Sequence, residues 1–310
     1  MSYELSKYIL TTVAYYDVMD YPMTAFEIWR HLTTHKSRSA IQNLHQFSLA
    51  EVLSDLEGEN LKKVIEKWRG FYFLRGRQKL VSVRSKRNKI SEEKYKILRK
   101  VTKILRFVPF VRMVAATGSL AMKNAEKSSD LDLLIVLESG KIFTGRTLVT
   151  LAVQFLGKRR HSEKITDRAC LNYFITTSSL EIGLKDLFSS SEYSFVQPLF
   201  GFEIFKKFQK ENGWIKKYKI TFQSDKVANL KLLDDTLVAK MVRNSGEKIL
   251  SFNFIENGLK KWQIKRIQRD PRTHQAGSMV LVSDDALVFL PTPQGPQIYD
   301  QFEAKLATLT

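Results

Sequence analysis

Thr117-Gly118-Ser119, followed after ten residues by Asp130-Leu131-Asp132, is the stretch that best indicates how this chain folds. The second triplet opens an apolar run from 131 to 137, which is typical of a buried strand. Side chains two apart on a strand project from one face, so Asp130 and Asp132 can hold a divalent metal ion together. A Gly-Ser turn that enters a helix offers backbone N–H groups and a hydroxyl to a phosphate. The stretch therefore predicts metal-assisted chemistry on a nucleoside triphosphate.

The flanking residues predict the elements that carry this stretch. Apolar and β-branched residues at 111–116 favour a strand that leads directly into the turn, and a helix is expected at 120–126. Residues 145–156 have apolar positions at helical spacing, and 169–175 predict another strand. A simple capped turn with two solvent-facing aspartates is the structural alternative to a functional site.

This order of motifs resembles the DNA polymerase beta superfamily of nucleotidyltransferases, whose signature is Gly-Ser, a spacer of about ten residues and Asp-x-Asp. The spacing also equals that of minimal nucleotidyltransferases found as antitoxins, and the resemblance covers residues 112–180. It implies that Gly118 and Ser119 hold the triphosphate. It also implies that Asp130 and Asp132 are the catalytic carboxylates, binding Mg²⁺ or Mn²⁺.

The superfamily usually adds a third carboxylate on a later strand, where it helps to activate the acceptor hydroxyl. Here the in-phase polar residue of the strand 169–175 is Asn172. An asparagine can ligate a metal through its carbonyl oxygen but cannot take a proton, so this chain departs from the pattern. Asp167 and Glu181 are the alternative acidic residues on either side of the strand.

The positive charge of the chain is concentrated in one segment. The 310 residues carry a formal net charge of +18, and residues 61–112 contain eighteen Lys or Arg against three acidic residues, a net charge of +15. Such a region is expected for a DNA or RNA partner, while a solvated lysine-rich helix face and a contact with an acidic protein surface are the alternatives. The smaller basic cluster at 158–161 is either a solvated helix end or a contact to triphosphate or acceptor.

The first 75 residues have the pattern of three short helices followed by a hairpin. A helix is expected at 4–17, capping boxes at 24–27 and 48–51 open two more, and two short strands flank Arg69-Gly70. The pattern resembles a winged helix. The third helix ends in acidic residues, so packing, RNA contact or partner binding is expected more than sequence-specific DNA reading. The residues expected to contact nucleic acid are Arg69, Arg75, Arg77, Lys79, Arg84, Lys86 and Arg87.

These observations predict an α+β protein. We expect a winged-helix-like domain at 1–88, a basic connecting helix at 89–110, a mixed-sheet nucleotidyltransferase domain at 111–185 and a mainly helical region at 186–310. In the last region, helices are expected at 195–214 and 230–268, and short strands at 279–282 and 287–290.

The remaining features bear on location and other chemistry. The start of the chain lacks a signal-peptide layout, and the single Cys170 has no disulfide partner and is expected to pack on its strand. No apolar run approaches the roughly 18 residues of a membrane span, so we expect a cytoplasmic protein without a membrane partner. The five histidines are scattered without metal-ligand spacing, which gives no reason to expect zinc.

Two functions remain. The first is an enzyme that uses Mg²⁺ and moves a nucleoside monophosphate from a triphosphate to a hydroxyl of RNA, protein or a small molecule. The second is a catalytically weak or inactive protein of the same fold that acts as a nucleic-acid-binding regulator or antitoxin-like adaptor, as the basic segment and Asn172 suggest.

Overall fold

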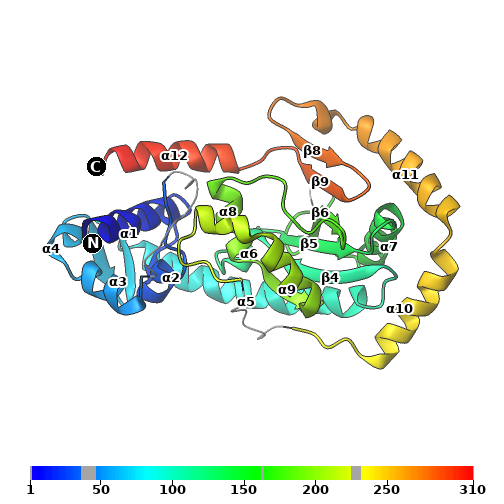
Figure 1. The fold of residues 1–310 in the computed structure, drawn as a ribbon, viewed down its shortest axis with the longest axis horizontal. Helices are drawn as coiled ribbons and strands as arrows, with labels where there is room; N and C mark the ends of the chain where they lie inside the picture. The colour runs from blue at the N-terminus through cyan, green and yellow to red at the C-terminus, as the bar shows by residue number, and fades with distance from the viewer. Residues whose placement is uncertain (1, 36–46, 162–163, 225–231, 310) are drawn as a thin grey trace.

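The computed structural model describes residues 2–35, 47–161, 164–224 and 232–309. A small helical unit with its own sheet lies beside a larger unit built around a six-stranded sheet (Figure 1). The predicted α+β class with a mixed central sheet is confirmed.

The N-terminal unit begins with helices and ends with a hairpin. Its elements are α1 (Ser2–Asp17), β1 (Met23–Thr24), α2 (Ala25–Arg30), α3 (Leu49–Leu56), α4 (Glu59–Lys62), β2 (Ile65–Trp68) and β3 (Phe71–Leu74). Both predicted capping boxes are present, at Thr24 and at Ser48. The predicted hairpin is β2–β3, and its turn puts Arg69 and Gly70 at positive φ, +48° and +80°. These elements fit the expected pattern, while the winged-helix assignment stays a prediction.

The long helix α5 (Leu80–Leu105) connects the two units (Figure 1). The sequence predicted a basic connecting helix at 89–110, and its start was wrong, because the helix already begins at Leu80. The buried face of α5 includes Arg84 and Lys94 beside its apolar residues. Charged side chains at core positions hide an amphipathic pattern, because burial of a paired charge cannot be read from hydrophobicity.

The central sheet has the strand order β7-β4-β5-β6-β9-β8. Its strands are β4 (Val111–Ala116), β5 (Leu131–Leu137), β6 (Ala169–Thr176), β7 (Gln197–Phe200), β8 (Met279–Val282) and β9 (Ala286–Leu290). β5 and β6 are parallel, and α7 (Ile142–Phe155) makes the crossover that parallel neighbours require. The other neighbouring strands are antiparallel.

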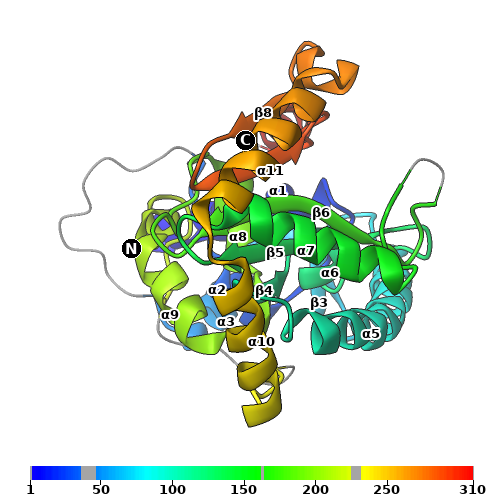
Figure 2. The same cartoon turned by 90° about the vertical axis from the view of Figure 1, so that its right-hand side faces the viewer.

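Helices cover both faces of the sheet (Figure 2). On one face, α5 and α7 pack on the side chains of Leu131, Leu133 and Ile135. On the other face, α8 (Leu187–Ser194), α9 (Phe202–Glu211) and the short helix η1 (Gly213–Lys217) cover Leu134 and Val136. Because strand side chains alternate, Asp132 belongs to this second face.

The C-terminal part is less helical than predicted. The prediction of a helical segment at 195–214 was wrong for Gln197–Phe200, which pairs as β7 with β4. Gly201 then turns the chain at φ +81°, where a Cβ would lie 2.0 Å from the Arg112 carbonyl oxygen. The predicted strands at 279–282 and 287–290 are present as β8 and β9, and they extend the opposite edge of the sheet.

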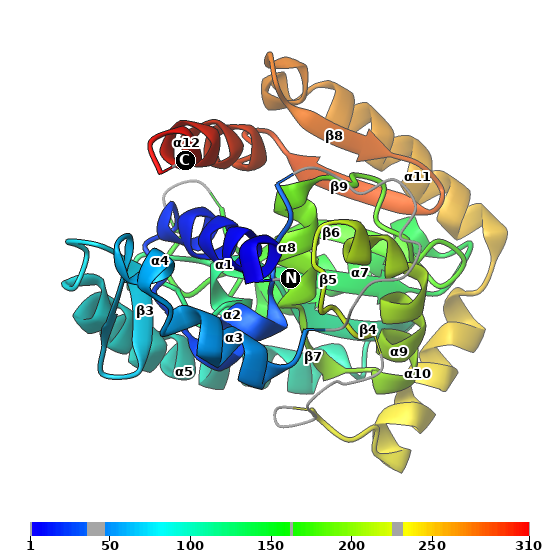
Figure 3. The same cartoon turned by 60° about the vertical axis from the view of Figure 1, so that its left-hand side comes forward.

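The last helix returns to the first. α10 (Leu237–Leu250), α11 (Asn253–Gln268) and η2 (Pro271–His274) precede β8, and α12 (Gly295–Ala307) follows β9. α12 lies beside α1 (Figure 3), and the fully buried ring of Phe302 contacts the Tyr15 ring edge-on at 5.3 Å between centroids. The C-terminal helix is therefore part of the N-terminal core.

Candidate active site

Asp130 and Asp132 converge at the start of β5. One ligand atom each of Asp130, Asp132 and Cys170 lie within 4.8 Å of one another. Cys170 takes part because β6 pairs in parallel with β5, which sets Asp132 opposite Cys170. The same-face geometry inferred from the Asp-x-Asp spacing is thus present in the fold.

Lys94 fixes the loop that leads into this pair. Its ammonium group, reaching from α5, donates hydrogen bonds to the carbonyl oxygens of Lys127 at 3.1 Å and Ser129 at 2.7 Å. It also pairs with the carboxylate of Asp167 at 2.7 Å. Because Lys94 is buried, these contacts hold the backbone directly before Asp130 and explain why α5 carries a charge at a core position.

The Gly118 turn lies against Asp132. Gly118 has φ +60°, and a Cβ at this position would come 2.7 Å from Asp132 Oδ2. The backbone N–H of Thr117 donates to the Asp132 carbonyl oxygen at 3.1 Å. Gly118 and Ser119 begin helix α6 (Gly118–Ala121), which is shorter than the helix predicted at 120–126. Turn and carboxylate therefore share one site, and glycine allows their close approach.

Glu192 is a carboxylate at this site that the sequence reasoning missed. It comes from α8 and accepts a hydrogen bond from the backbone N–H of Gly118. Burial, and after it the nearby charge of Asp132, raises the pKa of Glu192 to about 7. Glu192 follows three serines, 189–191, which form no known motif. Its place at the site depends on the packing of α8 onto the turn, so it could not be predicted from the sequence.

Asp132 itself is electrostatically strained. Burial and then the charge of Asp130 raise the pKa of its carboxyl group, Arg160 lowers it, and the resulting pKa is about 7. Arg160 Nη1 lies 2.5 Å from Asp130 Oδ2 and 3.4 Å from Cys170 Sγ. Two carboxylates held this close repel each other, and a cation between them relieves the repulsion. The guanidinium does so in part.

Asn172 lies next to the pair, whereas the alternative acidic residues do not. Asn172 Nδ2 is 3.5 Å from Asp132 Oδ1. Asp167 is held by Lys94, and Glu181 pairs with Lys185 at 2.7 Å. The residue on β6 that faces the aspartates is therefore an amide, as its phase in the sequence indicated.

The chemistry of the donor set suits a hard divalent cation. Carboxylate and amide oxygens are ligands for Mg²⁺ or Mn²⁺, and such sites typically combine one or two carboxylates with phosphate oxygens. Burial raises the pKa of the Cys170 thiol to about 12. Sulfur is a soft ligand, which Mg²⁺ and Mn²⁺ do not prefer, so Cys170 is not expected to ligate the ion. Asp130 and Asp132 would hold the ion, with Asn172 beside them.

The predicted nucleic-acid-contacting residues fall into two sets. Arg84 is buried, and its guanidinium pairs with Glu27 at 2.7 Å, stacks 3.9 Å above the Tyr21 ring and donates to the carbonyl oxygen of Lys123. The prediction that Arg84 meets nucleic acid is therefore wrong. Arg77 and Arg87 form ion pairs within the protein, and Arg75 donates to two backbone carbonyl oxygens.

The other predicted residues border a surface hollow of about 600 Å³ between the hairpin and the start of α5. The hollow combines basic with aromatic side chains. Its lining includes Trp68, Arg69, Phe71, Lys79, Lys86 and Lys89. We call this the hairpin hollow.

Comparison with known proteins bears on the central part of the chain. Residues 98–222 match the family model described as Nucleotidyltransferase domain. The match supports the nucleotidyltransferase superfamily and, more generally, nucleotidyl transfer. It extends on both sides of the predicted domain at 111–185, from α5 to beyond η1. Searches of curated proteins and of solved structures found no match. Within the described residues, no helix has the length and apolar character needed to cross a membrane.

Proposed function

We propose that the protein is a Mg²⁺-dependent nucleotidyltransferase that passes a nucleoside monophosphate from a triphosphate to a hydroxyl acceptor. The observation that carries the proposal is the approach of Asp130 and Asp132 to each other beside the Gly118 turn. The match of residues 98–222 to the nucleotidyltransferase domain supports it independently.

In this proposal the turn binds the phosphates and the aspartates bind the metal ion. Ser119 contributes its hydroxyl and the start of α6 its backbone N–H groups to the phosphates. The N–H of Gly118 is already engaged by Glu192, so it fixes the turn in place. Asp130 and Asp132 hold the metal ion, which neutralises phosphate charge when bound. From the neighbouring strand, Asn172 either ligates the metal ion through its carbonyl oxygen or orients the Asp132 carboxylate.

The reaction is a displacement at the α-phosphorus. The acceptor oxygen forms a bond to that phosphorus, and the bond from the phosphorus to the bridging oxygen breaks. Pyrophosphate leaves with the bonding electrons, and the hydroxyl proton is released to solvent. Catalysis of this type consists mainly of positioning and electrostatic stabilisation.

The test is transfer of label from an α-labelled triphosphate, with Mg²⁺ and a broad pool of hydroxyl acceptors. Asp130→Ala with Asp132→Ala should reduce transfer to background. The matched control, Asp234→Ala with Asp300→Ala, removes two exposed aspartates and should leave transfer unchanged. Transfer that survives loss of the site pair would refute the proposal.

A second function, nucleic-acid binding as a regulator or antitoxin-like adaptor, is favoured by the hairpin hollow. Exposed lysines beside Trp68 and Phe71 combine phosphate contacts with stacking surfaces for bases. Binding of single-stranded RNA should weaken steeply with salt, because each neutralised phosphate releases counterions. An affinity that is independent of salt would exclude this role.

A further inference from the structure

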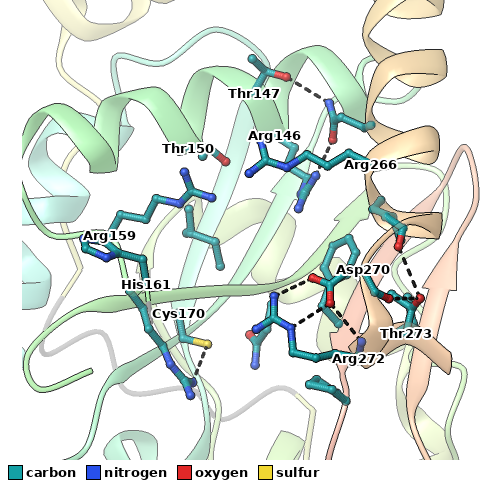
Figure 4. A pocket seen from close by; sticks show the side chains of 18 of the residues that line it. Arg146, Thr147, Thr150, Arg159, His161, Cys170, Arg266, Asp270, Arg272 and Thr273 are labelled. Carbon is teal, nitrogen blue, oxygen red and sulfur yellow. Dashed lines mark hydrogen bonds and ion pairs between the residues drawn. The ribbon is translucent and has the colours of Figure 1, made fainter. Parts of the chain in front are cut away.

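A second large cavity lies beside the aspartates, on the side of β6. Its volume is about 780 Å³, within the range of ligand pockets. Its wall is formed by α7, the segment that follows α7, the start of β6, α11, η2 and β9. We call it the arginine pocket, after its lining residues Arg146, Arg159, Arg160, Arg266 and Arg272 (Figure 4).

Two of these arginines are paired with carboxylates. Arg272 forms two hydrogen bonds with Asp270, at 2.6 and 3.0 Å. Arg160 is paired with Asp130. Asp270 is the one acidic residue that lines the pocket within the part of the chain that the structure describes.

The other three guanidinium groups gather without an ion-paired carboxylate among the described residues; Asp270 interacts electrostatically with Arg266 but is paired with Arg272. Arg146, Arg159 and Arg266 extend toward one another from three different segments (Figure 4). In the described ranges 2–35, 47–161, 164–224 and 232–309, none of the three forms an ion pair with a carboxylate. Arg146 donates instead to the neutral amide of Gln263, at 2.5 Å. The Nε of Arg146 is buried and has no hydrogen-bond partner in the part of the chain that the structure describes.

Without a bound anion, the repulsion among these three guanidinium groups destabilises the folded protein. Burial, and after it the positive charges of Arg159 and Arg266, lowers the pKa of Arg146 to about 10. Burial and then Arg266 lower the pKa of Arg159. Like charges that face one another in a partly buried cavity are stabilised by an anion, and guanidinium groups bind phosphate oxygens in a bidentate manner.

The rest of the lining suits the remainder of a small ligand. Thr147, Thr150 and Thr273 offer hydroxyl groups, while Leu171 and Phe289 form an apolar wall. A ligand with an ammonium group or only an aliphatic chain would not neutralise the positive charge of the arginines. A phosphorylated molecule with its own hydroxyl groups, such as a sugar phosphate, matches both parts of the surface.

The position of the pocket assigns it to the acceptor. The Gly118 turn follows β4, whereas the arginine pocket borders β6, and β5 with Asp132 lies between these two strands. Cys170 and Asn172 belong both to the surroundings of the aspartates and to the pocket wall. The arginines of α7 and α11 line the pocket on the face of the sheet opposite Asp132. A molecule that they hold would therefore reach the aspartates around the edge of β6 at Cys170 and Asn172, which lie outside the pairing of β6 with β9.

We propose that the arginine pocket binds the acceptor substrate, a small molecule that carries a phosphate monoester and a free hydroxyl. The inference rests on the proposed function, because it names the molecule to which the nucleotide is transferred. Arg146, Arg159 and Arg266 bind the phosphate, and the hydroxyl lies toward Asn172. The hydroxyl oxygen forms the bond to the α-phosphorus, pyrophosphate departs and the proton goes to solvent, as in the reaction above.

Calorimetric titration of the full chain with ribose 5-phosphate and with ribose tests the phosphate directly, in the absence of metal and nucleotide. Arg159→Gln with Arg266→Gln removes two of the unpaired charges. Neither guanidinium makes a hydrogen bond within the described residues, so the fold should persist, as circular dichroism can check. Lys207→Gln with Lys210→Gln removes the same charge from the exposed side of α9 as a control.

We expect the wild-type chain to bind ribose 5-phosphate but not ribose. The arginine variant should bind at least about tenfold more weakly, since charge-assisted hydrogen bonds are lost, and the lysine control should bind as the wild type does. Equal affinity of the arginine variant, or binding of inorganic phosphate as tight as that of ribose 5-phosphate, would overturn the assignment.

A further titration with a non-hydrolysable ATP analogue and Mg²⁺ separates this inference from the proposed function. The arginine variant should keep its affinity for the analogue; a parallel loss would assign the pocket to the triphosphate and overturn an acceptor site. If instead Asp130→Asn with Asp132→Asn leaves analogue binding intact, the proposed function fails while phosphate binding in the pocket still stands on its own measurement.

Discussion

At the scale of single residues, the site depends on how closely Gly118 approaches Asp132. The Asp pair and the Gly-Ser turn could be predicted from the sequence, because each is a local motif; their contact follows from the antiparallel pairing of β4 with β5. Glu192 could not, because α8 reaches the turn only through packing of distant segments. The strand pattern also predicted that the side chain of Asn172 faces the aspartates, but it did not give the 3.5 Å distance between Asn172 Nδ2 and Asp132 Oδ1.

Gly118→Ala should disturb both the turn and the site. The added methyl group meets Asp132 Oδ2, and the positive φ costs about 1–2 kcal/mol for an L residue. Gly70→Ala is the matched control, since Gly70 also has positive φ but an open space around its Cβ. Urea unfolding should show a comparable backbone cost for both variants. Only Gly118→Ala should weaken binding of Mg²⁺ with nucleotide; unchanged binding would contradict the role of the turn.

The raised pKa values of Asp132 and Glu192 predict a pH dependence. Both values are about 7 in the folded chain, above the usual 3.8 and 4.5, so between about pH 4 and 7 the folded state binds more protons than the unfolded state. Stability of the metal-free protein therefore falls as the pH rises through this interval. Asp132→Asn should raise the melting temperature by roughly 2–4 °C at about pH 8 and have little effect at about pH 5. A larger gain in melting temperature at about pH 5 than at about pH 8 would contradict the raised pKa of Asp132.

At the scale of elements, the sequence predicted those whose pattern is local. The capping boxes, the hairpin and the strands β4, β5 and β6 are of this kind. The start of α5 and the strand β7 were missed. Arg84 becomes a core residue only through partners elsewhere in the chain, and Gln197–Phe200 becomes a strand only by pairing with β4.

Arg84 and Lys86 lie on the same helix and should behave differently. Arg84→Met breaks a buried ion pair and leaves Glu27 uncompensated, which should cost about 3–5 kcal/mol in denaturant unfolding. Lys86→Gln changes an exposed residue of the hairpin hollow and should leave stability within about 0.5 kcal/mol. If the hollow binds nucleic acid, Lys86→Gln should lower the salt slope of RNA binding; a stability loss for Lys86→Gln equal to that of Arg84→Met would contradict this division.

At the scale of the whole molecule, segments far apart in the chain complete each other's cores. β7 closes one edge of the central sheet, β8 and β9 extend the other, and α12 joins the N-terminal unit. Composition along the sequence suggested a separate mainly helical region at 186–310, because local patterns carry no information on which distant segment a strand or helix will meet.

Removal of one aromatic ring tests whether α12 stabilises the N-terminal core. Phe302 is fully buried and contacts Tyr15, so Phe302→Ala should destabilise the chain by about 3–5 kcal/mol. Tyr299→Ala, on the partly exposed side of the same helix, should cost clearly less. Chemical denaturation compares the two, and a cost below about 1 kcal/mol for Phe302→Ala would show that α12 does not contribute to the N-terminal core.

The most direct test of the central claim is calorimetric titration of the whole chain with a non-hydrolysable nucleoside triphosphate, with and without Mg²⁺. The wild-type chain should bind the analogue in a Mg²⁺-dependent manner, and Asp130→Asn with Asp132→Asn should weaken binding by at least about tenfold. Binding that needs no Mg²⁺ and is equally tight in the double variant would contradict the claim that these two aspartates hold a metal-bound nucleotide.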